Sequence, residues 1–249
     1  MPRHDGRLDD ELRPPIITPH WLKHALGSAL ISMGDTKVLC AVSVEDRVPA
    51  YLKDKGEGWV TGEYAMLPAS GRERSSREVS KGRPSGRTME IQRLIGRALR
   101  SVVDRKALGP RTLWVDCDAL SADGGTRTAS ITGAYVALAL ALAKLREARV
   151  TRQPVLSGML AAISVGIVDG RPVLDLDYVE DSAAEVDMNV VRIDEDRYVE
   201  VQGTAETTPF RKDSLNAMLA LADFGIDRLQ QVQREIIGDA LERVLIPKR

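Results

Sequence analysis

The hydrophobic and polar positions in the first half of the chain alternate between strand-like and helix-like patterns. Valine-rich runs bounded by proline or turn residues predict strands, which suit a pleated, half-buried surface. These strands are expected over 36–45, 58–66 and 112–117. Over about 88–103, apolar residues recur at steps of three and four, which predicts a helix with one buried stripe. The stretch 129–145 is apolar on every side, so we expect a helix inside the fold.

The second half repeats this plan of strands followed by helices. Its strands are expected over 160–168, 173–178, 189–193 and 198–202. The first two form a predicted hairpin around Asp169-Gly170. Two closing helices are predicted over 213–224 and about 227–245, with Gly225 ending the first. The pattern as a whole predicts an α+β protein of two fused β-α units, in which mixed sheets pack against helices.

A polar stretch over 147–154 is the best candidate for a linker between the two units. We therefore expect an N-terminal domain over 1–150 and a C-terminal domain over 151–249. With 249 residues, of which 43% are hydrophobic, the chain is long enough for one large core or two smaller ones. Aromatic residues make up 4% of the chain, which argues against a stacking platform for single-stranded nucleic acid.

The net charge of −1 hides a separation of charge along the sequence. Residues 69–111 contain 12 Lys and Arg against 4 Asp and Glu, whereas residues 169–206 contain 12 acidic residues against 3 Arg. Such a chain is expected to offer one surface to polyanions and another to metals or protons, although two solvated surfaces would give the same counts. Polar residues over about 67–84 predict a basic loop that suits an RNA backbone. Its candidate contacts are Arg72, Arg74 and Arg77.

The buried helix begins after the run Gly-Gly-Thr-Arg-Thr at 124–128. The first turn of a helix has unpaired N–H groups and a partial positive charge, and hydroxyl and guanidinium groups placed there suit phosphate. An ordinary tight turn with a helix cap would carry the same residues. A second helix start carries Arg87, and two such ends converging on one anion would hold it firmly. We predict a phosphate site made by Arg87, Gly125, Thr126 and Arg127.

The acidic half contains four carboxylates that are close in sequence. On a strand, Asp175 and Asp177 would share one face, and Asp181 and Asp187 bracket the loop that follows, so all four are expected to cluster. Clustered carboxylates bind a hard cation such as Mg²⁺, or they raise the pKa of one member so that it serves as a general acid. A solvated acidic loop is the alternative. Beside a bound phosphate and a basic loop, such carboxylates suit phosphoryl transfer with inorganic phosphate as the nucleophile.

The remaining composition favours a cytoplasmic protein without membrane contact. Cys40 and Cys117 lie in apolar, strand-like runs and are expected to be buried free thiols in a reducing compartment. The three histidines are all near the N-terminus and give no zinc-ligand spacing. The N-terminal residues are polar and lack a secretory signal, and the apolar stretch 134–143 is too short to span a bilayer.

Seven runs of residues carry a resemblance to a known family. They are Gly-Asp-Thr-Lys-Val-Leu-Cys (34–40), Gly-Trp-Val-Thr-Gly-Glu-Tyr-Ala-Met-Leu-Pro (58–68), Gly-Arg-Thr-Met-Glu-Ile-Gln-Arg-Leu-Ile-Gly-Arg (86–97), Ala-Asp-Gly-Gly-Thr-Arg-Thr-Ala-Ser-Ile-Thr-Gly-Ala (122–134), Glu-Asp-Ser-Ala-Ala-Glu (180–185), Asp-Met-Asn-Val-Val (187–191) and Val-Gln-Gly-Thr-Ala-Glu (201–206). In register over nearly the whole chain, they resemble ribonuclease PH. The resemblance implies two units like the second domain of ribosomal protein S5, assembled as a homo-hexamer, a trimer of dimers.

The resemblance also implies a phosphate-dependent 3′→5′ exoribonuclease, a tRNA nucleotidyltransferase that trims tRNA precursors and other RNA 3′ ends. It makes Asp181 and Asp187 the catalytic carboxylates, associated with Mg²⁺. Arg87 and the turn Gly125-Thr126-Arg127 become the phosphate-binding groups, and Arg74 and Arg77 become tRNA contacts. One departure is Ala69, which stands where the family usually has a further arginine in the basic loop.

Two other functions stay open from the sequence. A non-catalytic RNA-binding subunit of an exosome-like ring would bind RNA without releasing a nucleotide, and the presence of both arginines and both aspartates argues against it. Plain hydrolysis would release nucleoside monophosphates without added phosphate. The resemblance favours phosphorolysis, which releases nucleoside diphosphates and is reversible.

Overall fold

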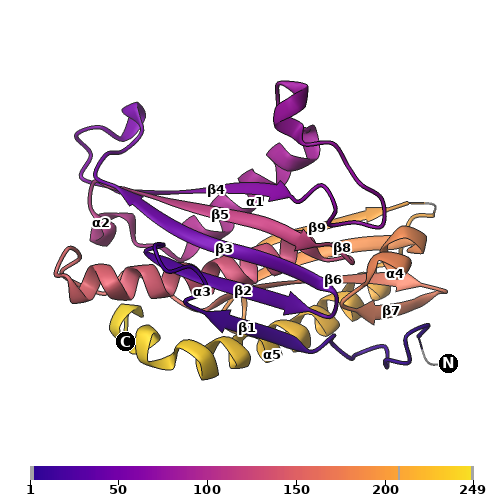
Figure 1. Ribbon diagram of the computed structural model, residues 1–249. Coiled ribbons are helices and arrows are strands. Elements are labelled where there is room, and N and C mark those ends of the chain that lie inside the picture. Colours follow the sequence, from indigo (N-terminus) through magenta and orange to yellow (C-terminus); the bar gives the residue numbers. More distant parts are fainter. Residues whose placement is uncertain (1–2, 207, 248–249) are drawn as a thin grey trace.

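The apolar helix α3 (Thr126–Glu147) lies at the centre of the fold, between two β-sheets (Figure 1). The computed structural model describes residues 3–206 and 208–247. Nearly every side chain of α3 is buried, as expected for a helix that is apolar on all sides. By length and composition α3 could cross a membrane, but 94% of its most apolar window is buried inside the protein. Its apolar surface therefore belongs to the core.

The N-terminal half forms a five-stranded sheet in the order β1-β2-β3-β5-β4. Its strands are β1 (Pro15–Pro19), β2 (Gly27–Met33), β3 (Thr36–Glu45), β4 (Trp59–Met66) and β5 (Thr112–Ser121). Strands β4 and β5 run parallel, and the other neighbours run antiparallel. The parallel pair needs a crossover, and helix α1 (Gly86–Val102) supplies most of it, packed on β4. The short helical segments are η1 (Ala50–Leu52), η2 (Glu78–Lys81) and α2 (Arg105–Leu108).

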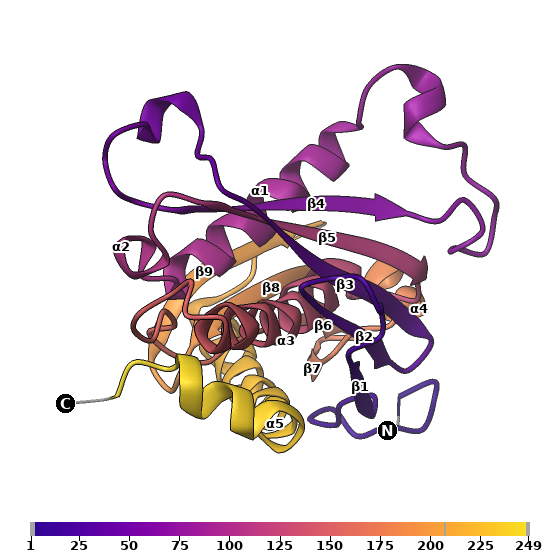
Figure 2. The same ribbon diagram turned by 60° about the vertical axis from the view of Figure 1, so that its left-hand side comes forward.

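The C-terminal half forms a four-stranded antiparallel sheet in the order β7-β6-β8-β9. Its strands are β6 (Leu160–Val168), β7 (Arg171–Leu174), β8 (Val186–Ile193) and β9 (Arg197–Ala205). The short helix α4 (Tyr178–Ala183) connects β7 to β8, and α5 (Lys212–Val244) closes the chain. Figure 2 shows α3 and α5 side by side beneath the first sheet. The predicted α+β class is confirmed.

One hydrophobic core runs through both halves of the chain. Helix α3 packs against β2 and β3 on one side and against β6 and α5 on the other. The stretch 147–154 follows the end of α3, and just beyond it Val155 N–H donates to the Val244 carbonyl (2.9 Å) and Ser157 N–H to the Val102 carbonyl (2.8 Å). The ends of α1 and α5 are thus tied together across the predicted linker. The division into two domains at residue 150 stays a prediction.

The two closing helices predicted from the sequence are a single helix, α5, so the expected stop at Gly225 is wrong. Gly225 instead lets α5 lie close to β7, since a Cβ at this position would be 2.8 Å from a methyl group of Leu174. The helix is interrupted further along, at Ile237, whose φ of −126° and ψ of 25° are not helical. In the sequence alone, a glycine required for close packing looks the same as a glycine that ends a helix.

Leu138→Ala tests the central role of α3. Leu138 is completely buried, and truncating it leaves a cavity, so the free energy of unfolding should fall by about 2–5 kcal/mol. Because the core is continuous, tryptophan fluorescence and far-UV circular dichroism should follow one shared denaturant transition. Leu8→Ala is the control, because Leu8 is 64% exposed and its loss should change stability by less than about 0.5 kcal/mol. Two separate transitions would contradict the continuous core.

Candidate active site

The turn before α3 is held in one conformation by its neighbours. Gly124 and Gly125 both have positive φ, of 74° and 65°. The Thr36 hydroxyl donates to the Gly124 carbonyl (2.7 Å) and accepts from Asp123 N–H (2.9 Å). A Cβ on Gly124 would lie 2.5 Å from the Leu176 carbonyl oxygen, so only glycine lets this turn press against the turn before α4. The two turns therefore meet at a fixed separation.

The start of α3 offers donors to an anion. Gly125 is the N-cap residue and provides no side-chain cap for the first N–H groups of the helix. Thr126 is buried, and its hydroxyl accepts a hydrogen bond from the Tyr64 hydroxyl (2.9 Å), which leaves the Thr126 proton to donate elsewhere. Sequence reasoning missed Tyr64, although the alternation of β4 places it on the inward face with Val60 and Gly62.

Two arginines from different helix starts converge beside this turn. The Arg127 guanidinium lies 3.3 Å from the Glu90 carboxylate of α1, and its buried Nε has no hydrogen-bond partner within the described protein. A buried donor without a partner is costly, so this atom calls for an acceptor. Arg87 is exposed in the first turn of α1, where the Ser85 hydroxyl caps the helix by accepting from Thr88 N–H (3.1 Å).

The predicted carboxylates Asp181 and Asp187 face the same arginines. Asp181 lies on α4, and Asp187 lies on β8 between Gly166 of β6 and Thr204 of β9. Burial raises the pKa of Asp187 to about 6, and the charge of Asp181 adds to this rise, while Arg127 and Arg87 oppose it. Desolvation by the surrounding protein also raises the pKa of Asp181, again against Arg127 and Arg87. Removal from water therefore outweighs the two positive charges at both carboxyls.

A cavity of about 630 Å³ joins the predicted phosphate turn, residues 124–128 at the start of α3, to α4 and the basic loop. The candidate residues that line it are Arg72, Arg87, Gly125, Thr126 and Asp181. Tyr178, the first residue of α4, also lines it, and the Arg72 guanidinium lies 5.3 Å from the centroid of the Tyr178 ring. Arg74 and Arg77 are exposed on the same loop, which stands out from the body of the protein before η2 (Figure 2).

The expected cluster of four carboxylates does not form, because Asp175 and Asp177 have structural partners. Strand β7 ends at Leu174, so the predicted strand over 173–178 is wrong and the two aspartates do not share a strand face. Asp175 has a φ of 55°, and its carboxylate accepts from the Arg13 guanidinium (2.6 Å) and from Arg13 N–H (2.8 Å). Asp177 is the N-cap of α4 and accepts from Glu180 N–H (3.0 Å).

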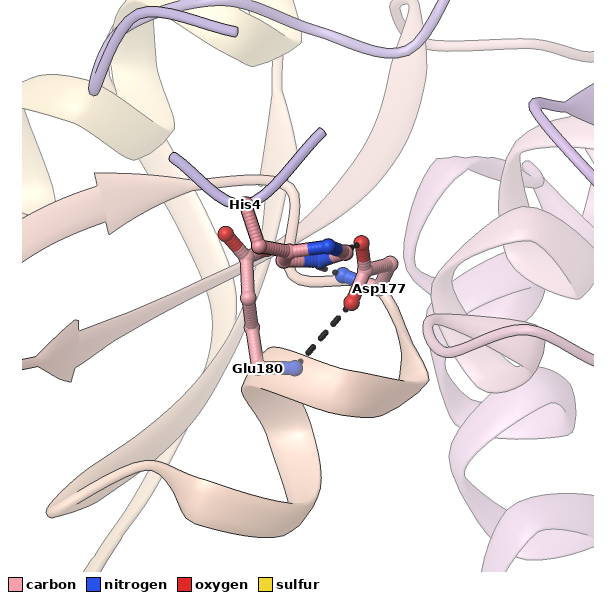
Figure 3. Close-up of side chains that lie close together, drawn as sticks. All are labelled: His4, Asp177 and Glu180. Atoms are coloured by element: carbon pink, nitrogen blue, oxygen red, sulfur yellow. Dashed lines mark hydrogen bonds and ion pairs between the residues drawn. The ribbon is translucent and has the colours of Figure 1, made fainter. Parts of the chain in front are cut away.

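His4, Asp177 and Glu180 lie close together at the start of α4 (Figure 3), with ligand atoms within 4.8 Å of one another. Their spacing could suit a cation, but the Glu180 carboxylate already pairs with Arg3, and the Arg7 guanidinium lies 3.4 Å from it. His4 Nε2 is 2.6 Å from the Asp177 carboxylate. Two buried guanidinium charges oppose a metal ion here, so we assign this group to the support of α4.

The sequence matches two profiles of the 3′ exoribonuclease family, domain 1 over residues 11–144 and domain 2 over residues 158–223. It is 57% identical over 244 residues to ribonuclease PH of Moorella thermoacetica, covering 98% of both chains. It is 55% identical over 240 residues to ribonuclease PH of Bacillus subtilis, covering 96% of this chain and 98% of the relative.

Solved structures with the same fold are more distant in sequence. One is a chain of the Archaeoglobus fulgidus exosome with RNA bound to the active site, at 22% identity and a TM-score of 0.77, covering 92% of each chain. Another is rice (Oryza sativa) Rrp46, at 19% identity and a TM-score of 0.76, covering 93% of this chain and 98% of that one. The sequence matches span both halves of the chain and all the candidate site residues, and this chain belongs to the 3′ exoribonuclease family, with ribonuclease PH among its relatives.

Proposed function

We propose that the cavity holds inorganic phosphate and uses it to remove the 3′-terminal nucleotide from RNA. The chain acts as a phosphate-dependent 3′→5′ exoribonuclease, a tRNA nucleotidyltransferase that trims the 3′ ends of tRNA precursors. The observation that carries the proposal is one cavity lined by Arg87, by the turn at the start of α3 and by Asp181. Arg127 and Asp187 do not line this cavity, but their charges act on the same group, since Arg127 and Arg87 oppose the rise in pKa of both carboxyls.

The phosphate is the nucleophile in this proposal. Arg87 and Arg127 would hold it through their guanidinium groups, and Gly125 and Thr126 would offer helix N–H and hydroxyl donors. One phosphate oxygen attacks the phosphorus of the last phosphodiester, the bond to the 3′-oxygen breaks, and that oxygen takes up a proton. The products are a nucleoside diphosphate and an RNA shorter by one residue. Catalysis here rests on positioning and on neutralising charge.

The carboxyls of Asp181 and Asp187 would assist the departure of the leaving group, the 3′-oxygen of the shortened RNA. With its pKa of about 6, Asp187 can hold a proton near neutral pH and donate it to the departing 3′-oxygen. The two desolvated carboxyls are also the oxygen donors that suit Mg²⁺, so Asp181 and Asp187 are the residues that would hold it. When bound, Mg²⁺ would neutralise charge on the transferring phosphoryl group.

The basic loop would hold the RNA outside the cavity. Arg72, Arg74 and Arg77 are exposed on the loop that borders the phosphate turn, and Ala69 adds no charge there. Guanidinium contacts of this kind read the RNA backbone and not its sequence. We propose a homo-hexameric assembly of this chain, a proposal supported by the archaeal exosome chains that share its fold and are themselves parts of a larger assembly. The buried free thiols Cys40 and Cys117 fit the reducing cytoplasm, where we place the activity.

The released nucleotide distinguishes the functions left open by the sequence. A tRNA with a labelled 3′ extension is incubated with the protein, with and without phosphate, and the labelled product is identified. Phosphorolysis gives nucleoside diphosphates only when phosphate is present. Monophosphates formed without phosphate would indicate hydrolysis, and bound RNA without any released nucleotide would indicate a non-catalytic ring subunit.

Arg87→Gln should raise the KM for phosphate and lower kcat/KM about 10²–10³-fold, because it removes one of two guanidinium groups from the nucleophile. The measurement is the initial rate of nucleoside diphosphate release over a range of phosphate concentrations. Arg93→Gln is the matched control, since Arg93 is an exposed arginine on the same helix. An unchanged KM for phosphate in the Arg87 variant would remove Arg87 from the phosphate site.

Replacing Arg74 and Arg77 together by Ala should raise the KM for tRNA about tenfold and leave the KM for phosphate within about twofold. Losing two phosphate contacts should also make the slope of log Kd against log salt shallower by about 1.5. Filter binding of tRNA at several salt concentrations measures this slope. The control replaces Lys53 and Lys55 by Ala, because both are exposed and the same charge is lost. Equal slopes in the two variants would argue against loop contacts with RNA.

Asp187→Asn should abolish phosphorolysis and still raise the melting temperature at pH 8. Folding raises the pKa of Asp187 from 3.8 to about 6, because burial favours the protonated carboxyl over the carboxylate. The contribution of this group to the free energy of unfolding is therefore complete below pH 3.8 and is lost as the pH rises through 6. The neutral amide avoids this loss, so the gain over wild type should be present at pH 8 and vanish near pH 4. Asp175→Asn is the control and should lower the melting temperature, because it breaks the buried ion pair with Arg13. The measurement is the thermal melt of each variant at pH 4 and pH 8. A lower melting temperature of Asp187→Asn at pH 8 would contradict the assignment of Asp187 as a buried carboxyl of raised pKa.

A further inference from the structure

The N-terminal segment, residues 3–13, reaches across the molecule to the C-terminal half. Three of its side chains, Arg3, Arg7 and Arg13, are buried, although arginine is seldom buried without a dedicated partner. All three contact the stretch 174–180, which precedes and begins α4. None of the sequence patterns predicted this contact, and the phosphorolytic mechanism does not use it. The segment is therefore a candidate for a further role in the site.

Arg3 makes the most complete set of bonds. Its Nε donates to Glu180 Oε1 (2.6 Å), its Nη1 donates to the Leu174 carbonyl (2.7 Å) and its Nη2 donates to the Asp175 carbonyl (3.0 Å). A fourth bond joins Nη2 to the other oxygen of Glu180. The side chains of Arg3 and Glu180 are only 2% and 4% exposed. This fork fixes the end of β7 and the first turn of α4 to one another.

The same segment also touches the cap of α4. Asp177 and Glu180 form a reciprocal capping box, in which Asp177 Oδ1 accepts from Glu180 N–H and Glu180 Oε2 accepts from Asp177 N–H (3.2 Å). Arg3 binds the Glu180 side of this box. His4 lies on the Asp177 side (Figure 3), with its Nε2 2.6 Å from the Asp177 carboxylate. The next residue of the helix is Asp181, whose N–H donates to the Asp177 carbonyl (2.8 Å).

A helix of six residues has little stability of its own, so the direction of α4 depends on what holds its first turn. We propose that Arg3 is a positioning residue for the catalytic carboxylate Asp181, acting through Glu180 and the carbonyls of Leu174 and Asp175. This proposal rests on the proposed function, in which Asp181 faces the leaving group. Arg3 touches no substrate and none of the phosphate-binding residues.

Arg13, a second buried arginine of the same segment, makes contacts that differ from those of Arg3. It binds the Asp175 carboxylate, and it also donates to the Asp123 carbonyl in the turn before α3. Loss of Arg13 should therefore disturb both the carboxylates and the phosphate turn. Loss of Arg3 should disturb the carboxylates alone. The two arginines predict different kinetic signatures, which a purely structural role would not give.

The test compares Arg3→Met with wild type in phosphorolysis of a 3′-extended tRNA. We expect kcat to fall about 10–100-fold, as for a small displacement of a catalytic group, while the KM for phosphate changes less than about threefold. Arg13→Met should lower kcat and also raise the KM for phosphate. The control is Arg192→Met, which removes another buried arginine of β8 and its ion pairs with the more exposed Asp223 and Asp227 of α5. Arg192 does not line the cavity, so this variant should keep kcat within about twofold.

A compensated variant separates positioning from folding. Arg3→Met leaves the buried Glu180 charge poorly paired, so the double variant Arg3→Met/Glu180→Gln should regain most of the lost melting temperature. If Arg3 positions α4, kcat stays low in this double variant, because the bonds to the Leu174 and Asp175 carbonyls are still missing. Recovery of kcat together with stability would overturn the proposal.

A second measurement does not depend on activity. Hydrogen exchange followed by mass spectrometry should show faster exchange in 174–183 of the Arg3→Met variant, with 124–136 at the start of α3 unchanged. Unchanged exchange in 174–183 would overturn the positioning role. Absence of nucleoside diphosphate with the wild-type protein would instead overturn the proposed function, and the exchange data would still decide the role of Arg3.

Discussion

The burial of α3 along its whole length is the constraint on which the site depends. A helix covered on one face can tilt or slide, but α3 is enclosed by both sheets and by α5, so its N-terminal end has one position. The unpaired N–H groups at that end are therefore fixed in the protein before any ligand arrives. Preorganised donors of this kind need no rearrangement during the reaction.

The candidate site lies where the two halves of the chain meet, and each half contributes charge of one sign. The first half brings Arg87 and Arg127 on the starts of α1 and α3, and the second half brings Asp181 and Asp187 on α4 and β8. The separation of charge along the sequence thus becomes a juxtaposition in space. Because β8 is a strand of the second sheet and α4 is a short helix beside it, the two carboxyls depend on different supports.

What decides the role of each carboxylate is how closely its charge is compensated. Asp175 and Asp177 accept hydrogen bonds of 2.6 to 3.0 Å and serve to hold turns together. Asp187 meets arginines only at longer range, so desolvation dominates and its pKa rises to about 6. Residues of one type, close together in one acidic stretch, therefore divide into those that hold turns together and those that we propose for the chemistry.

Much of this arrangement follows from local pattern, and the rest depends on distant contacts. A valine-rich run that ends before a proline located β3, and spacing of three and four located α1, because each pattern reflects a buried surface. The glycine and arginine at a helix start predicted phosphate binding at the turn before α3, and this assignment stays a prediction. No local pattern showed that Asp175 has a different role from Asp187. That difference depends on the bond from Arg13 to Asp175, and these two residues are 162 positions apart in the chain. Gly225 was misread for the same reason, since its neighbour Leu174 lies on another element.

A phosphorolytic site must bring two anions together, the attacking phosphate and the RNA phosphodiester, and this requirement explains where its arginines lie. If all the arginines surrounded the phosphate, the RNA would meet no positive charge on entry. In this chain Arg87 and Arg127 lie at the helix starts, while Arg74 and Arg77 are exposed on the basic loop. The carboxyls of raised pKa complete the balance, because a protonated carboxyl adds no negative charge between two anions. In the proposed mechanism, the fraction of Asp187 that is protonated near neutral pH would lessen the repulsion between the two anions and also supply the proton.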